Sequence, residues 1–338
     1  MKRRVTIITP VYNEEDSLPL YVETVRNVLL ERSDVEFDVL LVDDGSSDRS
    51  WELIERACAA DARFRGLRLS RNFGAHIALC AGFDAARADA VAILACDLQD
   101  PPETVLEFVA KWRAGADIVW GHRRERDDLL WRRLVSRLFE GAMRRYAMPR
   151  GSRFTTGSFL LADRKVVEAV QHMREHSRIT FALVAWTGFR QEIVHYDRMR
   201  RRGGRSGWTF WRMVLAMYDA FVGFSLLPIR LTTALGIAVS LLNVPLAVYL
   251  VTRWLLGNPL PGYTSVMLVL TVFFGIQFLL MGLIGEYLYR IYLEAVQRPL
   301  YFVSHRCGAD AGQAPESGPR LLQQQVGARQ ARDDVQGA

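Results

Sequence analysis

The chain has 338 residues, of which 50% are hydrophobic and 24% charged, and its formal net charge is +6. This length suits one substantial domain together with an extension. The four cysteines are scattered without Cys-x-x-Cys spacing. The absence of that spacing argues against a zinc site or a disulfide framework, and it fits a reducing compartment.

Short apolar runs alternate with helical stretches through the first half of the chain. We predict strands at residues 5–9, 37–42, 67–69, 90–96 and 117–121, with a further strand at 154–161. Helices are expected behind Ser17, a suitable N-cap, from about residue 50, from 74 to about 86, from Glu103, and at 163–172. This alternation predicts right-handed βαβ units and an α/β fold with a mainly parallel sheet flanked by helices.

Polar side chains follow each of the first four predicted strands. In chain order they are Tyr12 and Glu14, Asp43 and Asp44, Arg71 and Asn72, and Asp97 and Gln99. Because parallel strands end at one edge of a sheet, we expect these groups to converge where ligands bind in open α/β folds. Carboxylates there can accept hydrogen bonds from ribose hydroxyls or a base N–H, and Arg71 can meet a phosphate.

The segment after the fourth strand offers a metal site. Asp97 and Gln99 present hard oxygen ligands, which suit Mg²⁺ or Mn²⁺ carrying the phosphates of a nucleotide. An ordinary Asx turn is the alternative there, and a plain turn is the alternative for Asp44-Gly45-Ser46. No Gly-x-Gly-x-x-Gly follows the first strand and no Gly-Lys-Ser/Thr loop is present, which excludes a dinucleotide oxidoreductase and a P-loop ATPase.

Two long apolar runs occupy residues 231–252 and 264–285, and Arg253 is the one charged residue between 231 and 285. Each run is close to the roughly 20 residues that cross a bilayer core, so we predict two transmembrane helices. A helical hairpin buried in a soluble core is the alternative. The chain is basic enough for nucleic acid, but its arginines gather beside the apolar runs, so we expect no nucleic-acid partner. Arg230, Arg290, Arg298 and Arg306 flank these runs.

The positive-inside rule then places both termini and the first domain in the cytoplasm, with the loop 253–263 outside. No signal peptide is expected, because MKRR runs directly into the first strand. Residues 127–148 and 208–230 combine apolar stripes with arginines or aromatic residues, as interfacial helices do. An ordinary packing helix is the alternative for 127–148. Residues 286–307 are read as a cytoplasmic extension, and 308–338 as a disordered tail.

Several motifs occur together and in order: TPVYNEEDSL, LLVDDGSSDRS, SRNFGAHIAL, DLQDPPE and GLIGEYLYRIYLEAVQRPLYFV. With them the chain resembles the polyprenyl-phosphate glycosyltransferases of glycosyltransferase family 2. That group includes dolichol-phosphate mannose synthases, bactoprenol glucosyltransferases and undecaprenyl-phosphate formamido-arabinose transferases. The resemblance implies a GT-A fold in residues 1–207, two transmembrane helices and, in some relatives, a tetramer. It also implies inverting transfer from a nucleotide sugar to a lipid phosphate at a bacterial inner membrane.

The resemblance also assigns roles to residues of this chain. The implied nucleoside-binding residues are Pro10, Tyr12, Glu14, Asp43 and Asp44, beside which we expect Arg71 and Asn72. Asp97 and Gln99 match the metal and diphosphate ligands. The residues expected near the acceptor phosphate are Arg123, Arg201, Arg205 and Ser206, of which Arg201 and Ser206 match an Arg-x-x-Gly-x-Ser loop. We expect catalysis to depend on Asp97, Arg201 and Ser206. A solvated basic face, or contact with lipid headgroups, is the alternative for Arg123 and Arg205.

Three positions depart from the family pattern. Ala95 and Thr155 stand where relatives carry aspartate, and Gly207 stands where they carry lysine. These departures are compatible with an unusual donor, a weaker dependence on metal or an inactive copy, and we favour an active enzyme with a different sugar. A processive polysaccharide synthase is disfavoured, because no Gln-x-x-Arg-Trp motif is present. A non-catalytic nucleotide-sugar-binding membrane protein is the remaining alternative.

Overall fold

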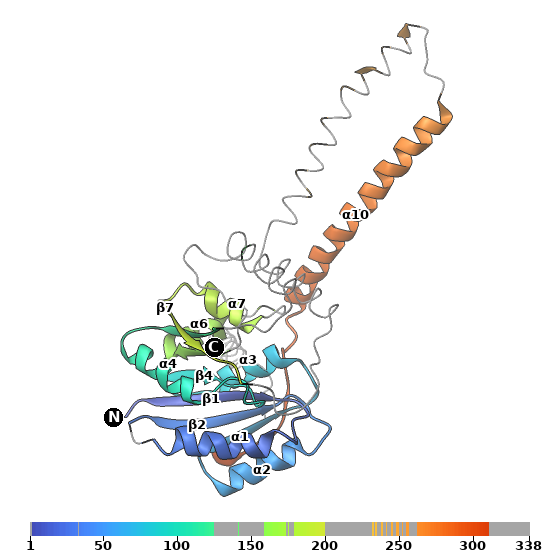
Figure 1. The fold of residues 1–338 in the computed structure, drawn as a ribbon. Coiled ribbons are helices and arrows are strands. Elements are labelled where there is room, and N and C mark those ends of the chain that lie inside the picture. The colour runs from blue at the N-terminus through green and yellow to red at the C-terminus, as the bar shows by residue number, and fades with distance from the viewer. Residues whose placement is uncertain are drawn as a thin grey trace, which may run out of the picture. The chain divides into compact units, whose positions relative to one another are not determined.

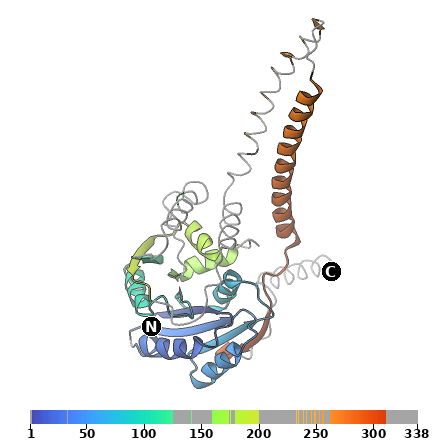
Figure 2. The same ribbon diagram turned by 45° about the vertical axis from the view of Figure 1, so that its right-hand side comes forward.

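The computed structural model describes residues 2–32, 34–124, 141, 159–173, 175, 179–199 and 262–310, with single residues between 232 and 256. The chain divides into two compact units, Met1–Met213 with Arg298–Ala338, and Val214–Gln297. The first unit is a sheet with helices on both faces (Figures 1 and 2). This confirms the predicted α/β class.

The sheet has eight strands in the order β7-β5-β6-β4-β1-β2-β3-β8. Their bounds are β1 Arg4–Val11, β2 Glu36–Asp43, β3 Phe64–Leu69, β4 Ala90–Ile93, β5 Ile118–Arg123, β6 Leu160–Asp163, β7 Gln191–Tyr196 and β8 Val303–Cys307. β1 is parallel to β2 and β4, β2 to β3, and β5 to β7, whereas β6 and β8 run antiparallel to their neighbours. Six strands therefore end at one edge, which we call the carboxyl edge.

Helices follow most of these strands. Their bounds are α1 Leu18–Val25, continued by η1 Arg26–Leu30, α2 Ser50–Ala60, α3 Ala75–Ala85, α4 Glu103–Arg113, α6 Arg164–His172 and α7 Thr180–Trp186. α4 begins at Glu103, behind the two prolines, as predicted. Ser17 occupies the N-cap of α1 but its side chain makes no capping bond. The short turn η2, Gly308–Asp310, follows β8.

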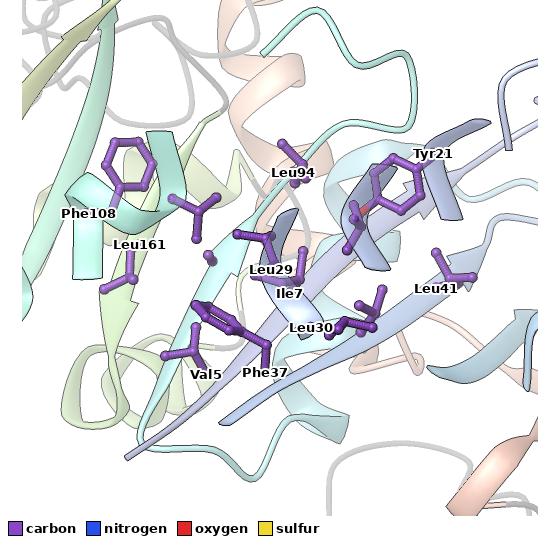
Figure 3. Packing of buried hydrophobic residues seen from close by; sticks show 14 of the residues in the cluster. Val5, Ile7, Tyr21, Leu29, Leu30, Phe37, Leu41, Leu94, Phe108 and Leu161 are labelled. Atoms are coloured by element: carbon purple, nitrogen blue, oxygen red, sulfur yellow. The ribbon is translucent and has the colours of Figure 1, made fainter. Parts of the chain in front are cut away.

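The central strands β1, β2 and β4 are buried on both faces along most of their length. Val5 and Ile7 of β1 join a core cluster with Leu29 of η1 and Phe108 of α4, and all four side chains are fully buried (Figure 3). Ile8 points to the other face, where a β-carbon on Gly82 of α3 would lie 2.5 Å from its Cγ2. Burial of each large apolar side chain contributes about 1.5–3 kcal/mol, which fixes the strand register and hence the carboxyl edge.

Several elements differ from the sequence prediction. The fourth strand was expected at 90–96, but β4 ends at Ile93, and Leu94 adds one more hydrogen bond to Ile8 O at 3.1 Å. α7, β7 and β8 were not predicted. β8 lies in the predicted cytoplasmic extension and pairs with β3, and there the Cys307 thiol donates to Cys58 Sγ at 2.7 Å. The four cysteines are free thiols.

In the second unit, α10 spans Tyr263–Val296 and so covers the second predicted apolar run. Within the described residues, no helix is both long enough and apolar enough to cross a membrane. Several predictions lie wholly or mainly outside the described residues. They are the helices at 127–148 and 208–230, the strand at 154–158, the first apolar run, the loop 253–263 and the tail from 311.

Candidate functional site

Asp43 ends β2 at the carboxyl edge and is completely buried. Its Oδ1 accepts a hydrogen bond from the Ser46 backbone N–H at 3.0 Å, and its Oδ2 pairs with Arg68 Nε at 3.1 Å. Arg68 also donates to Ser46 O at 3.0 Å. Burial raises the pKa of Asp43, and the hydrogen bonds from Ser46 oppose that rise. The turn that was expected as an alternative for residues 44–46 is therefore present, and the side chain of Asp43 stabilises it.

Asp44 joins the loops that follow β2 and β3. Its Oδ1 accepts from Phe73 N at 2.8 Å and its Oδ2 from Gly74 N at 2.9 Å. The side chain is only 2% exposed, and this burial raises its pKa against the effect of the two backbone donors. Gly45 has φ +70°, and a β-carbon there would lie 2.4 Å from the backbone carbon of Arg71. Only glycine lets the two loops approach this closely.

The loop after β1 is cross-linked to the same region. Asn13, with φ 52°, accepts on its Oδ1 from Ser47 N at 2.9 Å, and Glu14 N donates to Ser50 Oγ at 2.9 Å. Pro10 pairs with Val42 within the sheet. Tyr12 follows the strand and is 48% exposed. An exposed aromatic ring beside buried carboxylates is a surface on which a nucleobase can stack.

Arg71 and Asn72 follow β3 and are both exposed at the carboxyl edge. The Arg71 guanidinium lies 4.2 Å from the centroid of the Phe73 ring. The Asp44 hydrogen bonds hold this loop beside the end of β2. The structure thus brings together the predicted residues of the first three strand ends.

The segment after β4 carries the predicted metal ligands. Asp97 and Gln99 are both partly exposed, and Asp97 Oδ1 accepts from the Gln99 backbone N–H at 3.2 Å. Leu98 between them has φ 51°, a conformation that non-glycine residues rarely adopt. Such backbone strain persists where the surrounding structure enforces it, and it occurs often at ligand sites.

Behind this segment lies a buried carboxylate, Asp100, which is 3% exposed. Tyr196 of β7 donates its hydroxyl to Asp100 Oδ1 at 2.5 Å, and Arg123 of β5 donates from Nε to the Tyr196 hydroxyl at 3.2 Å. Arg123 Nη2 lies 3.8 Å from Asp100 Oδ1. Burial and the Asp100 charge raise the pKa of Tyr196, so it remains a neutral donor. The network joins the ends of β4, β5 and β7.

Arg198 reaches the same segment from beyond β7. Its guanidinium donates to Gln99 Oε1, and the neighbouring Met199 N donates to Gln99 O at 2.9 Å. The pKa of Arg198 is lowered, because the surrounding chain displaces water and because the Arg123 charge lies nearby. Two cationic side chains, Arg123 and Arg198, therefore converge beside Asp97.

Asp97 and Gln99 offer a small set of oxygen donors for a divalent metal ion. Mg²⁺ in nucleotide sites is commonly held by one or two carboxylates together with substrate phosphates and water. Asp97 supplies one carboxylate, and Gln99 supplies an amide oxygen that already holds the cationic Arg198 group. Among the described residues no group of three or more His, Cys, Asp or Glu side chains forms a metal cluster. These two oxygens fit a metal that arrives with a diphosphate, and no self-sufficient metal cage is present in the described part.

Not every predicted residue can be placed. Arg201, Arg205 and Ser206 lie outside the described residues, as does Thr155. Ala95, a departure from the family pattern, lies two residues beyond the end of β4 and is partly exposed.

Sequence reasoning missed three residues that the structure brings to Asp97. They are Asp100, in its role at the network, and Tyr196 and Arg198. The alternating pattern of Gln191–Tyr196 was a usable signal for a strand, because such a strand would carry Arg198 to the carboxyl edge. Its neighbours in the sheet could not be read from that pattern.

Known proteins resemble this chain along nearly its whole length. The model of the family "Glycosyl transferase family 2" matches residues 6–171. An uncharacterized glycosyltransferase of Synechocystis sp. is 38% identical, with 92% of this chain and 98% of that protein covered. A prophage-derived bactoprenol glucosyl transferase of Shigella flexneri is 32% identical, with 90% and 99% covered. The undecaprenyl-phosphate 4-deoxy-4-formamido-L-arabinose transferase of Yersinia pestis is 35% identical, with 91% and 95% covered.

A solved structure gives a weaker likeness. The mannosyltransferase of Pyrobaculum calidifontis, in complex with GDP-Man and Mn²⁺, is 18% identical and aligns with a TM-score of 0.42 over 86% of this chain and 88% of that one.

Proposed function

This chain belongs to glycosyltransferase family 2, and from that premise we propose that it transfers a sugar from a nucleotide-sugar donor to a polyprenyl phosphate. Two relatives with names of this reaction class align over at least 95% of their own length. The product is a polyprenyl-phosphate sugar for modification of a cell-envelope glycan or lipid, such as lipopolysaccharide. The single observation that carries the proposal is that the carboxylates behind β2 and β4 lie at one edge of the sheet.

We assign the donor's nucleoside to the end of β1 and β2. The proposal is supported by the buried carboxylates of Asp43 and Asp44 beside the exposed ring of Tyr12. Carboxylate oxygens keep free lone pairs after each accepts one N–H, so they can still accept from ribose hydroxyls or a base N–H. The other residues that we assign to the donor are Pro10, Glu14, Arg71 and Asn72.

We assign the donor's diphosphate to Asp97 and Gln99. A bound Mg²⁺ or Mn²⁺ would supply charge neutralisation of the departing nucleoside diphosphate. Asp97 and Gln99 would hold it, and Arg123 contributes further positive charge, with its side chain held by Tyr196 at 3.2 Å. Pre-oriented charge of this kind is a large part of catalysis in such sites.

The acceptor needs positioning more than activation. A lipid phosphate monoester has a second pKa near about 6, so it is already largely ionised at neutral pH and requires no dedicated general base. Arg123, Arg201, Arg205 and Ser206 are the proposed phosphate-binding residues. Attack by the phosphate oxygen on the anomeric carbon, in line with the departing diphosphate, inverts the configuration of that carbon.

We further propose that the protein is a multi-pass protein of the bacterial inner membrane. The two apolar runs at 231–252 and 264–285 support this, as does the gathering of arginines at their outer ends. In this arrangement the first unit and both termini are cytoplasmic, and interfacial helices at 127–148 and 208–230 bring the site to the lipid. A homotetramer, as the family resemblance implies for some relatives, is part of the same proposal.

The test is product formation by the purified full chain in detergent. Undecaprenyl phosphate, Mg²⁺ or Mn²⁺ and a panel of UDP-, GDP- and dTDP-sugars are supplied, and glycolipid is detected by mass spectrometry. We expect one glycolipid, absent in Asp97→Ala. A wild-type protein that binds nucleotide but forms no glycolipid from any donor would favour a non-catalytic nucleotide-sugar-binding role, for which Ala95 and Thr155 are the motivating residues.

A further inference from the structure

Arg198 makes a hydrogen bond at the candidate diphosphate site that is incompatible with metal binding to the same oxygen. Its guanidinium donates to Gln99 Oε1, the oxygen assigned to the metal. A guanidinium and a divalent cation on one amide oxygen repel each other strongly at such short range. Metal coordination by Gln99 therefore requires Arg198 to leave.

The backbone around Arg198 stays in place when the side chain leaves. Met199 N donates to Gln99 O at 2.9 Å, and Arg124 N donates to Tyr196 O at 3.0 Å. The first bond ties the segment after β7 to the segment after β4, and the second ties the end of β7 to the end of β5. The Arg198 side chain itself is exposed, so it can change partner without a change of fold. A guanidinium released there would remain close to Asp97, whose charge acts on Arg198 in this structure.

Among the described residues around Asp97, Arg198 supplies one of two positive charges. Asp97 and Asp100 carry two negative charges, and Arg123 and Arg198 carry two positive charges, so this group is neutral by itself. A divalent cation adds two positive charges, which match the two to three negative charges of a nucleoside diphosphate. Loss of Arg198 would halve the positive charge that these described side chains offer to the diphosphate.

We propose that Arg198 exchanges Gln99 for the donor diphosphate and so binds the leaving group of the reaction. This rests on the proposed function. Guanidinium groups bind phosphate oxygens through paired N–H donors, and such charge-assisted bonds are stronger than neutral ones. The exchange couples the metal and the nucleotide: each ligand makes binding of the other more favourable.

The competing view is that Arg198 only fastens the segment after β7. The two views differ in what they predict for Mn²⁺ alone and for nucleotides of different charge. If Arg198 competes for Gln99, its removal leaves Mn²⁺ binding intact or tighter. If it is only a fastener, its removal loosens the site for every ligand.

The experiment is calorimetric titration of the full-length protein in detergent with Mn²⁺, with UDP, GDP and dTDP in the presence of Mn²⁺, and with the matching nucleosides. We expect Arg198→Ala to weaken binding of the nucleoside diphosphate about 10-fold or more, with nucleoside binding unchanged and Mn²⁺ binding no weaker. Arg198→Lys keeps the charge without the paired donors and should be intermediate.

Arg124→Ala is the matched control, because Arg124 is an exposed arginine of the same region that pairs with Asp197 at 3.4 Å. It should bind all ligands like the wild type. Wild-type affinity of Arg198→Ala for the nucleoside diphosphate, or equal weakening for nucleoside and diphosphate, overturns the inference. A wild-type protein that binds none of the three diphosphates overturns the proposed function itself, and the inference with it.

Discussion

Asp43 and Asp44 behind β2, and Asp97 and Gln99 behind β4, occupy the same edge of the sheet but are built differently. Asp43 and Asp44 are buried, and between them they accept three backbone N–H groups. Asp97 and Gln99 are partly exposed, and their side chains contact one backbone N–H and one guanidinium. The first pair forms part of the fold, whereas the second stands at its surface.

The two pairs therefore suit two different parts of the donor, the nucleoside and the metal-bound diphosphate. A nucleoside is a rigid group recognised by fixed acceptors, so its half can be formed before the ligand arrives. A metal and a diphosphate bring their own charges. The part of the site that binds them therefore needs side chains that can exchange one partner for another. Mutations of the buried carboxylates Asp43 and Asp44 should therefore affect folding and binding together. Mutations of Asp97 and Gln99 should affect metal and diphosphate binding and the chemistry, but not folding.

We expect the largest effect on turnover for Asp97→Asn. The substitution keeps the shape of the side chain and removes the charge that would hold the metal. We expect a loss of about 100-fold or more in turnover, because charge stabilisation of the leaving group is lost. The melting temperature should stay at the wild-type value. Glycolipid formation and thermal unfolding measure the two, and a marked drop in melting temperature would show that Asp97 is structural.

Gly45→Ala tests the first half by its folding. Gly45 has φ +70° and no room for a β-carbon, which would meet Arg71 at 2.4 Å. We expect a loss of about 2 kcal/mol or more in the free energy of unfolding, measured by denaturant titration. Gly188→Ala is the control, since Gly188 has φ +73° but nothing lies within 4 Å of its added carbon. Equal losses in both variants would mean that the contact with Arg71 is unimportant.

Tyr12→Ala probes the nucleoside half without touching the fold. The ring is 48% exposed, so its removal should leave the melting temperature unchanged. If a base stacks on it, nucleotide affinity should fall about 10-fold, because such stacking contributes about 1–3 kcal/mol. Tyr12→Phe keeps the ring and should bind like the wild type. Unchanged nucleotide affinity in Tyr12→Ala would remove Tyr12 from the site.

A pH titration gives the smallest and most graded effect. Burial raises the pKa of Asp43 and Asp44 above the ordinary value. The folded state then binds protons more tightly than the unfolded chain, so these two groups add stability as the pH falls from the raised pKa toward the ordinary one. Over the same interval the protonated carboxyls lose acceptor capacity, so nucleotide affinity falls.

Asp44→Asn is the control for that titration. Because its side chain cannot ionise, the variant should show a smaller pH dependence of nucleotide binding, with only the contribution of Asp43 remaining. Affinity that is independent of pH in the wild type down to the ordinary carboxyl pKa would contradict a donor role for both residues.

The sequence was informative for functional side chains that come directly after a strand. Asp43, Asp44, Asp97 and Gln99 each come within a few residues of a buried apolar run, and parallel strands must end together. The parallel sheet and the carboxyl edge could therefore be predicted before any coordinates were known.

What could not be predicted depends on pairing between distant segments. β8, with the sequence VSHRC, is an edge strand with few apolar residues, and its place beside β3 follows from a long-range contact. Arg198 reaches Gln99 only because β7 pairs with β5 in the register Arg123↔Tyr196. A local pattern carries no information on such a register. The bonds of Asp44 to Phe73 and Gly74 likewise required the backbone of two loops.

The proposed acceptor of the sugar is a lipid phosphate. The most direct measurement is the release of nucleoside diphosphate from the donor identified by mass spectrometry, with and without undecaprenyl phosphate, for wild-type protein and Asp97→Asn. We expect release that requires the lipid, matches glycolipid formation one to one and is lost in Asp97→Asn. Release at the same rate without lipid would contradict it, since the acceptor would then be water.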